Sequence, residues 1–222
     1  MQYSILPRLC GCFSLCLAAA LPLDARIGES RSDVESRLIR ESGRGLEISD
    51  GDLEAFYLAR SPVSGPVSAL EGENVQTVLY YKTNDDLRPS SADLWQRDKN
   101  GRRSSNPDPK PDGWILEVVY LNGVSVLELY QRSKPLTDFE IKGLLAANQG
   151  RAEWVEGAPP EEDEEVLAPQ VFPVNHYRRD LGVYANVSGN SVLLYDPRLD
   201  ALIDEKQTES AAEKAPASLD GF

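Results

Sequence analysis

The amino-acid sequence predicts an α+β protein of two small modules, each a short antiparallel sheet with short helices packed on one face. Two stretches, 114–131 and 181–195, carry strand-like residues on both sides of a turn that contains Gly and Asn. Each stretch is followed by a capped helical pattern, at 136–150 and 196–206. Helices of this length are not stable alone in water, so each must bury its apolar stripe against a sheet.

The first helix is predicted within RIGESRSDVESRLI, residues 26–39. It begins at Ser30 or Ser32, because each serine is followed three residues later by an acid that completes a capping box. Gly43 ends the helix, since glycine adopts the left-handed conformation at low energetic cost.

The clearest strand pattern is the hairpin at 114–131. Asn122 and Gly123 tolerate the positive φ angles of a type I′ turn, and this turn pairs Leu121 with Val124. The register predicts a core face made of Leu116, Val118, Leu127 and Leu129, with Trp114 and Tyr120.

The same register places Glu117 opposite Glu128 on the other face, where two like charges destabilise a sheet. One interpretation is a carboxylate pair for acid–base chemistry or cation binding. The other is a solvated sheet face whose charges are screened by water and nearby cations. We favour the solvated face, because no helper residue is visible nearby in the sequence.

The helix at 136–150 has the strongest boundary signals. Thr137 caps it, Glu140 closes the capping box, and Gly150 supplies the C-terminal stop. Gly143 lies inside the helix, where glycine is about 1 kcal/mol less favourable than alanine, and it suggests close packing.

Further strands are expected at 74–83 and 53–60 in the first sheet and at 152–156 on the edge of the second. In the last helix, Asp196 is the cap and Pro197 takes the first helical position.

These patterns divide the chain into a first module at 26–150, a second at 151–206 and a disordered tail at 207–222. The first module carries a polar insertion at 84–113, and the second begins with an acidic linker at 156–170. Both segments are predicted to be long exposed loops, because they are rich in charge, proline and glycine.

Residues 1–25 have the pattern of a secretory signal peptide, with a single early cation, a short apolar run and small residues near its end. Cleavage is expected after Ala20 or, preferably, after Ala25. A lipoprotein leader is less favoured: the apolar run before Cys12 is too short, and Cys16 follows a leucine. The remaining alternative is a buried N-terminal helix in a cytosolic protein.

The signal peptide is the interpretation that we favour. We therefore expect an exported protein, periplasmic or secreted, with no transmembrane span after cleavage.

Loss of the leader would remove all three cysteines, and with them any disulfide, thiolate nucleophile or cysteine metal ligand. The formal net charge of the whole chain is -13. Strong negative charge repels phosphate backbones and anionic membrane surfaces, so nucleic-acid binding is disfavoured.

Few residues suggest chemistry. His176 is the only histidine, there is no G-x-S-x-G elbow, and no P-loop or dinucleotide glycine pattern occurs. The oxygen-rich segments 49–54 and 106–112 are interpreted as turns, because neither has the ligand spacing of a known calcium loop. The cation pairs 102–103 and 178–179 are expected to be solvated or internally paired. The sequence thus predicts no catalytic residue, cofactor site or metal site.

Several of these segments together resemble a known group of proteins. The start ARIGES, the helix SRSDVESRLI, the strands VVYLNGVSVLELY, the helix LTDFEIKGLLAANQG and the strand AEWVE are similar to uncharacterised secreted bacterial proteins with an Arg–aliphatic–Gly–Glu start. More remotely, the order of helix and antiparallel strands resembles the small outer-membrane assembly lipoproteins (the SmpA/OmlA family) and the β-lactamase inhibitory protein. These motifs are caps, turns and packing residues, so they transfer no functional residue.

The function expected from the sequence is non-enzymatic binding of another exported protein or an envelope component, for which open sheet faces and edges are suited. Two alternatives remain: a hydrolase that uses Glu117 and Glu128 or His176, and a structural component of the envelope.

Overall fold

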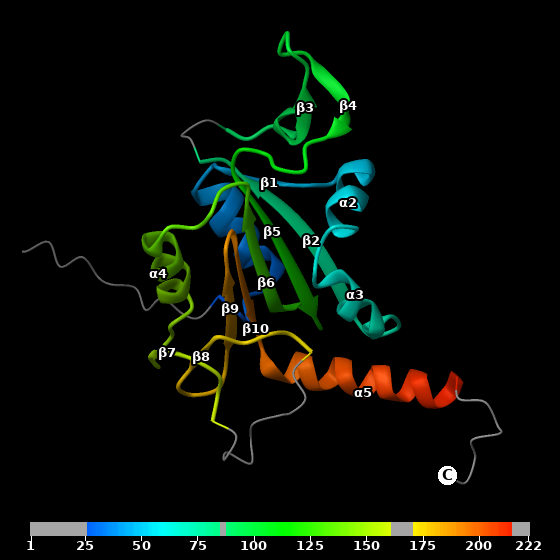
Figure 1. Cartoon of the computed structure of the whole chain (residues 1–222), viewed down its shortest axis with the longest axis vertical. Coiled ribbons are helices and arrows are strands. Elements are labelled where there is room, and N and C mark those ends of the chain that lie inside the picture. Colours follow the sequence, from blue (N-terminus) through cyan, green and yellow to red (C-terminus); the bar gives the residue numbers. More distant parts are fainter. Residues whose placement is uncertain (1–25, 85–87, 161–170, 215–222) are drawn as a thin grey trace, which may run out of the picture.

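The α+β class is confirmed, and the hairpins of both predicted modules lie in one sheet (Figure 1). The computed structural model describes residues 26–84, 88–160 and 171–214. The sheet has eight strands in the order β1-β2-β5-β6-β10-β9-β8-β7, and every neighbouring pair is antiparallel. Its strands are β1 (Gly45–Glu47), β2 (Val75–Lys82), β5 (Trp114–Leu121), β6 (Val124–Arg132), β7 (Trp154–Glu156), β8 (His176–Arg178), β9 (Tyr184–Ser188) and β10 (Ser191–Tyr195).

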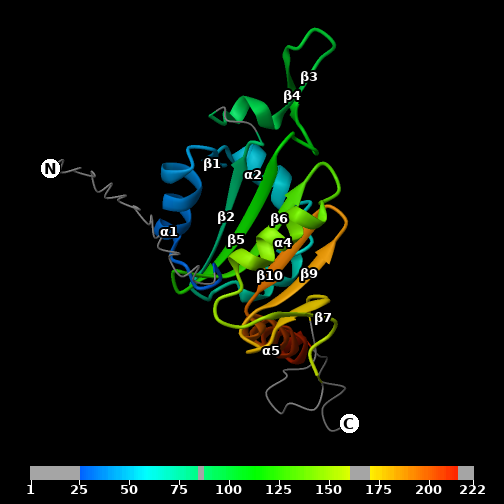
Figure 2. The same ribbon diagram turned by 90° about the vertical axis from the view of Figure 1, so that its left-hand side faces the viewer.

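Helices cover both faces of the sheet, whereas the sequence predicted one covered face (Figures 1 and 2). One face carries α1 (Arg31–Glu35), its π-helical continuation η1 (Ser36–Glu41) and α4 (Asp138–Ala147). The other carries α2 (Gly51–Leu58), α3 (Ser64–Val67), η2 (Ser68–Leu70) and α5 (Pro197–Lys214). The central strands are therefore apolar on both sides, as buried strands must be.

The pairing of β6 with β10 joins the two halves of the chain. Leu129 of β6 lies opposite Leu193 of β10, and the ladder continues along both strands. On each face of the sheet, residues of both hairpins thus pack in the same hydrophobic cluster.

The β5–β6 hairpin has the predicted turn but a different register beyond it. Asn122 and Gly123 have φ angles of 53° and 84°, and Leu121 pairs with Val124. A β-bulge follows, because Val119 pairs with Leu127 while Tyr120 pairs with Ser125. The extra residue, between Ser125 and Leu127, moves the rest of β6 to the opposite face.

The predicted core face of this hairpin is therefore wrong for β6. Leu116, Val118 and Tyr120 pack under α1 and α4 as expected, but Leu127 and Leu129 pack on the face of α3 and α5.

Helix boundaries follow the predicted caps. The side chain of Ser30 accepts from the backbone of Asp33, and that of Thr137 accepts from Glu140, with both capping boxes complete. Gly43 has a φ angle of 63°, as expected for the residue that ends the first helix.

The segment at 53–60, expected as a strand, is the helix α2. Asp50 decides this, because its carboxylate accepts hydrogen bonds from the backbone of Asp52 and Leu53 and so caps the helix. The oxygen-rich segment 49–54 is thus a helix start.

The insertion at 84–113 is not only an exposed loop. It contains η3 (Ser91–Leu94) and a projecting hairpin of β3 (Trp95–Arg97) and β4 (Arg103–Pro107) (Figure 1). Leu94 and Trp95 are buried against α2 and the sheet, so the base of the insertion belongs to the core.

The tail expected from 207 onward begins with helix, because α5 extends to Lys214. This part of α5 is mostly Ala, Glu, Lys and Gln, which favour helix. Among the described residues, no helix has the length and apolar character needed to span a membrane. The predicted leader and most of the acidic linker, 161–170, lie outside the described residues.

Candidate functional site

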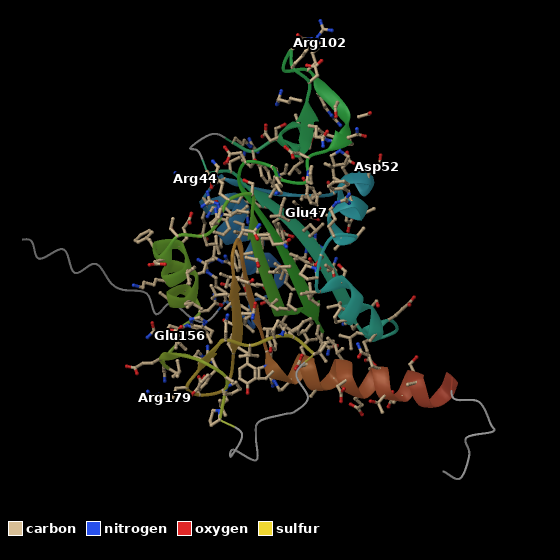
Figure 3. The ribbon with its side chains drawn as sticks, viewed as in Figure 1. Arg44, Glu47, Asp52, Arg102, Glu156 and Arg179 are labelled. Atoms are coloured by element: carbon tan, nitrogen blue, oxygen red, sulfur yellow. The ribbon has the colours of Figure 1, made fainter. Side chains whose placement is uncertain are left out.

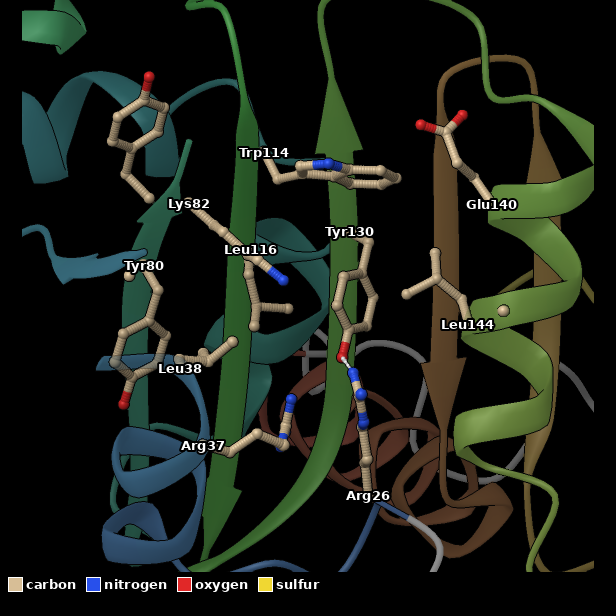
Figure 4. Close-up of a pocket in the computed structure, with 13 residues that line it drawn as sticks. Arg26, Arg37, Leu38, Tyr80, Lys82, Trp114, Leu116, Tyr130, Glu140 and Leu144 are labelled. Carbon is tan, nitrogen blue, oxygen red and sulfur yellow. Dashed lines mark hydrogen bonds between the residues drawn. The ribbon is translucent and has the colours of Figure 1, made fainter. Parts of the chain in front are cut away.

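A pocket of about 260 Å³ opens between η1 and α4, over strands β2, β5 and β6 (Figure 4). The strands supply its floor, and the two helical segments supply its walls. Ligand pockets commonly have about 300–1,000 Å³, so this one suits a small molecule or one end of a longer one. Its character is set by three cations, from Arg26, Arg37 and Lys82, set among aromatic and aliphatic side chains.

Lys82 is the last residue of β2, and its side chain points into the pocket between Leu116 and Tyr130 (Figure 4). Within the described part of the chain, the ammonium group of Lys82 forms no hydrogen bond or ion pair. Burial, followed by the guanidinium groups of Arg26, Arg37 and Arg44, lowers the pKa of Lys82 below its ordinary value. The ammonium group is therefore a partly buried charge surrounded by charges of the same sign.

The two arginines of the pocket are held by partners. Arg37 of η1 contacts Glu29 at 2.7 Å and lies 3.6 Å from the carboxylate of Glu128. Arg26 donates to the hydroxyl of Tyr130 at 3.4 Å, and the same hydroxyl donates to Glu128. One buried nitrogen of Arg37, Nη1, has no hydrogen-bond partner among the described residues.

The backbone of the first described residues is anchored at the end of α4. The buried side chain of Asn148 accepts from the backbone nitrogens of Arg26 and Ile27, at 3.1 and 3.4 Å. Its amide group donates to the carbonyl of Leu144 at 3.1 Å. This anchor places Arg26 at the pocket, although it is far in sequence from every strand of the floor.

The α4 wall is open at Gly143. A Cβ atom built on Gly143 meets no heavy atom within 4 Å, whereas one built on Gly45 would lie 2.4 Å from the carbonyl oxygen of Leu38. The close packing that the sequence suggested for Gly143 is therefore absent. The missing side chain instead leaves space at the pocket wall, beside Leu144.

Glu140 is the one acid among the described residues that line the pocket, and its carboxylate already has hydrogen-bond and ion-pair partners. It caps α4 through Thr137 and forms an ion pair with Arg132. Hydrogen bonds to Thr137 and the nearby Arg132 hold the pKa of Glu140 below its ordinary value. It is thus not free to neutralise Lys82.

The predicted carboxylate pair does not exist as a pair. Glu117 lies opposite Leu129, and Glu128 lies opposite Val118, because of the bulge in β6. Both side chains are buried, 2% and 0% exposed, so the favoured solvated face was also wrong.

Glu117 is on the α3 face, where Ser64 donates to it at 3.5 Å. Burial raises the pKa of Glu117, and hydrogen bonds from Ser61 and Ser64 oppose that shift. Burial also raises the pKa of Glu128, against the effects of Arg37 and Tyr130.

His176 lies on β8, and its Nδ1 is 2.8 Å from the side-chain oxygen of Asn175. Segment 106–112 is a packed connection, since the carbonyls of Asp108 and Asp112 accept from the hydroxyls of Tyr57 and Tyr81. Among the described residues, no three acidic, histidine or cysteine side chains are grouped so that they could hold a metal ion.

The two cation pairs lie far apart (Figure 3). Arg102 is at the tip of the β3–β4 hairpin, and Arg103 stacks on Trp95 with its guanidinium carbon 4.2 Å from the ring centroid. Arg178 pairs with Asp180 at 2.7 Å, and the exposed Arg179 lies near Glu153 at 3.8 Å. Arg178 and Arg179 are thus internally paired, as expected, whereas Arg103 is stacked on an aromatic ring.

No family model, curated protein or solved structure matches this chain. The resemblance to secreted bacterial proteins therefore stays a prediction. Sequence reasoning missed this pocket because its residues come from separate segments between Arg26 and Leu144, none with a motif.

Proposed function

We propose that this protein is exported and acts by binding, and that the pocket between η1 and α4 holds a small molecule or one group of an envelope component or exported partner. The supporting observation is Lys82. A partly buried charge without a partner among the described residues is unfavourable for the fold, so its retention in the lining of a pocket favours a role toward a ligand. Gly143 supports the same conclusion, because alanine would give a more stable helix and a narrower pocket.

Binding fits the site better than the hydrolase alternative. Catalysis by a carboxylate pair requires both groups to reach the same substrate atoms. Glu117 and Glu128 lie on opposite faces of the sheet, and neither lines the pocket. His176 contacts an asparagine amide, which orients a ring but supplies no nucleophile.

The binding proposal is tested by filling the pocket. We expect Nile red, a neutral dye that fluoresces in apolar surroundings, to bind the full chain saturably with a stoichiometry of one. Gly143→Trp should abolish this binding, because the indole would occupy the open wall. Lys142→Trp is the matched control, since Lys142 is exposed on the same helix and does not line the pocket. Equal dye binding by the two variants would contradict the proposal.

Export is tested separately, by fractionating the producing cells and determining the N-terminus of the protein. A mature chain that begins at Arg26 or at Leu21, outside the cytoplasm, is the expected result. A cytoplasmic chain that still begins at Met1 would contradict export without affecting the pocket.

A further inference from the structure

The electrostatic character of the pocket is opposite to that of the chain. The whole protein has a formal net charge of -13, yet three cations line this one hollow. Its single lining acid, Glu140, is paired with Arg132 outside the lining. Glu29 and Glu128 offset the charge of Arg37 from outside the lining. The lining itself still carries more positive than negative charge, and a pocket of this character attracts anions.

The three cations differ in whether their hydrogen-bond donors already have partners. The guanidinium of Arg37 is bound to Glu29, and that of Arg26 is directed at Tyr130. The ammonium of Lys82 has three donors and no partner among the described residues. An anionic group beside Lys82 would satisfy those donors and neutralise the repulsion from the two arginines.

The rest of the lining is apolar. Leu38, Leu116 and Leu144 line the pocket, Leu116 beside the ammonium group, and the indole ring of Trp114 lies across one end (Figure 4). A small, fully hydrated anion such as phosphate would leave these surfaces uncovered. A ligand that also carries an apolar body would bury them, at roughly 25 cal/mol per Å² of apolar surface removed from water.

We propose, building on the function above, that the ligand is an organic anion with one anionic headgroup and an apolar body, whose headgroup binds Lys82. The apolar body packs on Leu38, Leu116, Leu144 and Trp114. Straight-chain carboxylates are the simplest molecules of this class.

The test compares three probes with the same ten-carbon body: decanoate, decanol and decylammonium. Isothermal titration of the full chain should show decanoate binding with a stoichiometry of one, at least tenfold more tightly than decanol, because hydrogen bonds to charged groups are strong. Decylammonium should not bind. Gly143→Trp should abolish decanoate binding.

Lys82→Met separates the charge from the packing, since methionine keeps an apolar stem of similar shape. Decanoate should bind at least tenfold more weakly to this variant, whereas decanol affinity should stay within about twofold. Lys82→Arg should restore decanoate binding, and Lys142→Met, which removes an exposed charge outside the pocket, should leave it unchanged. Lys82→Met should also be as stable as the natural chain or more stable, because it removes an uncompensated charge.

Equal affinity for decanoate and decanol, or full decanoate binding by Lys82→Met, would overturn the anion specificity and leave the binding proposal intact. Loss of stability in Lys82→Met would overturn the view that this lysine serves a ligand and not the fold. Failure of Nile red and of all three probes to bind would overturn the binding proposal itself.

Discussion

The carboxyl groups of Glu117 and Glu128 lie on opposite faces of the sheet, although their strands are paired along almost their whole length. A single bulge in β6 produces this arrangement. It places Glu128 beside Tyr130 and Arg37, whereas among the described residues Glu117 has only the hydroxyls of two serines beside it. The two buried acids therefore have different electrostatic surroundings, and they should respond differently to substitution.

Glu117→Gln should stabilise the protein at neutral pH, by about 1 kcal/mol or more, because it removes a buried carboxylate that has no cation beside it among the described residues. Burial raises the pKa of Glu117 in the folded state. Between its ordinary pKa and this raised value, the folded state binds more protons than the unfolded state, so stability falls as pH rises. The gain from Glu117→Gln should therefore be large at pH 7 and small at pH 4.

Urea unfolding of the natural chain and of Glu117→Gln at a series of pH values measures how the stability gain changes with pH. Glu71→Gln is the control, because Glu71 is exposed and its substitution should change little at any pH. A gain from Glu117→Gln that is the same at pH 4 and pH 7 would show that the buried charge is not its cause.

Gly143→Ala should raise the free energy of unfolding by about 0.5–1 kcal/mol, since alanine is the better helix former and its Cβ meets no atom within 4 Å. Gly45→Ala should have the opposite effect, because its Cβ would lie 2.4 Å from the carbonyl oxygen of Leu38. We expect a loss of about 1–3 kcal/mol for this overpacked site. Denaturant titration of the two variants measures whether the free energy of unfolding rises for Gly143→Ala and falls for Gly45→Ala. Destabilisation by Gly143→Ala would show that the α4 wall of the pocket is closed.

Leu94→Ala should lower the free energy of unfolding by about 2–5 kcal/mol, the usual range for truncating a buried leucine. Leu94 is 0% exposed and packs against α2 and the sheet, although it lies in a segment that the sequence predicted to be an exposed loop. Thermal and urea unfolding should show one cooperative transition with a lower midpoint. Lys99→Ala, at the exposed tip of the hairpin, is the control and should leave the midpoint unchanged. A neutral Leu94→Ala would mean that the insertion is independent of the core.

The features that the sequence predicted correctly are those determined by neighbouring residues. The capping boxes at Ser30 and Thr137 and the turn at Asn122 and Gly123 depend on contacts within four residues, so the local pattern is sufficient. The bulge in β6 is different, because an extra residue leaves no mark in a strand where apolar residues occupy both faces.

The candidate site could not be predicted for a related reason. No sequence pattern distinguishes Lys82, Arg26 and Arg37 from other cations of the chain. Only the fold brings them together in the lining of the pocket. The anchor on Asn148 and the pairing of β6 with β10 are contacts between distant segments, which no local pattern encodes. The one available signal was Gly143, a glycine inside an otherwise favourable helix, and this pattern indicates close packing as readily as an open pocket wall.

The affinity for decanoate should depend on pH through Lys82. Burial and the charges of Arg26, Arg37 and Arg44 lower the pKa of Lys82, so its ammonium loses a proton at lower pH than an ordinary lysine. Because the anion binds the protonated form, affinity should be constant near neutral pH and should fall as pH rises, before ordinary lysines titrate. Titrations at pH 6 to 10 measure this fall in affinity.

Lys82→Arg should remove the pH dependence, since a guanidinium stays charged throughout this range. A fall of the same size in Lys82→Arg would assign the pH dependence to another group, and affinity that stays constant up to pH 10 in the natural chain would show that the headgroup does not bind Lys82.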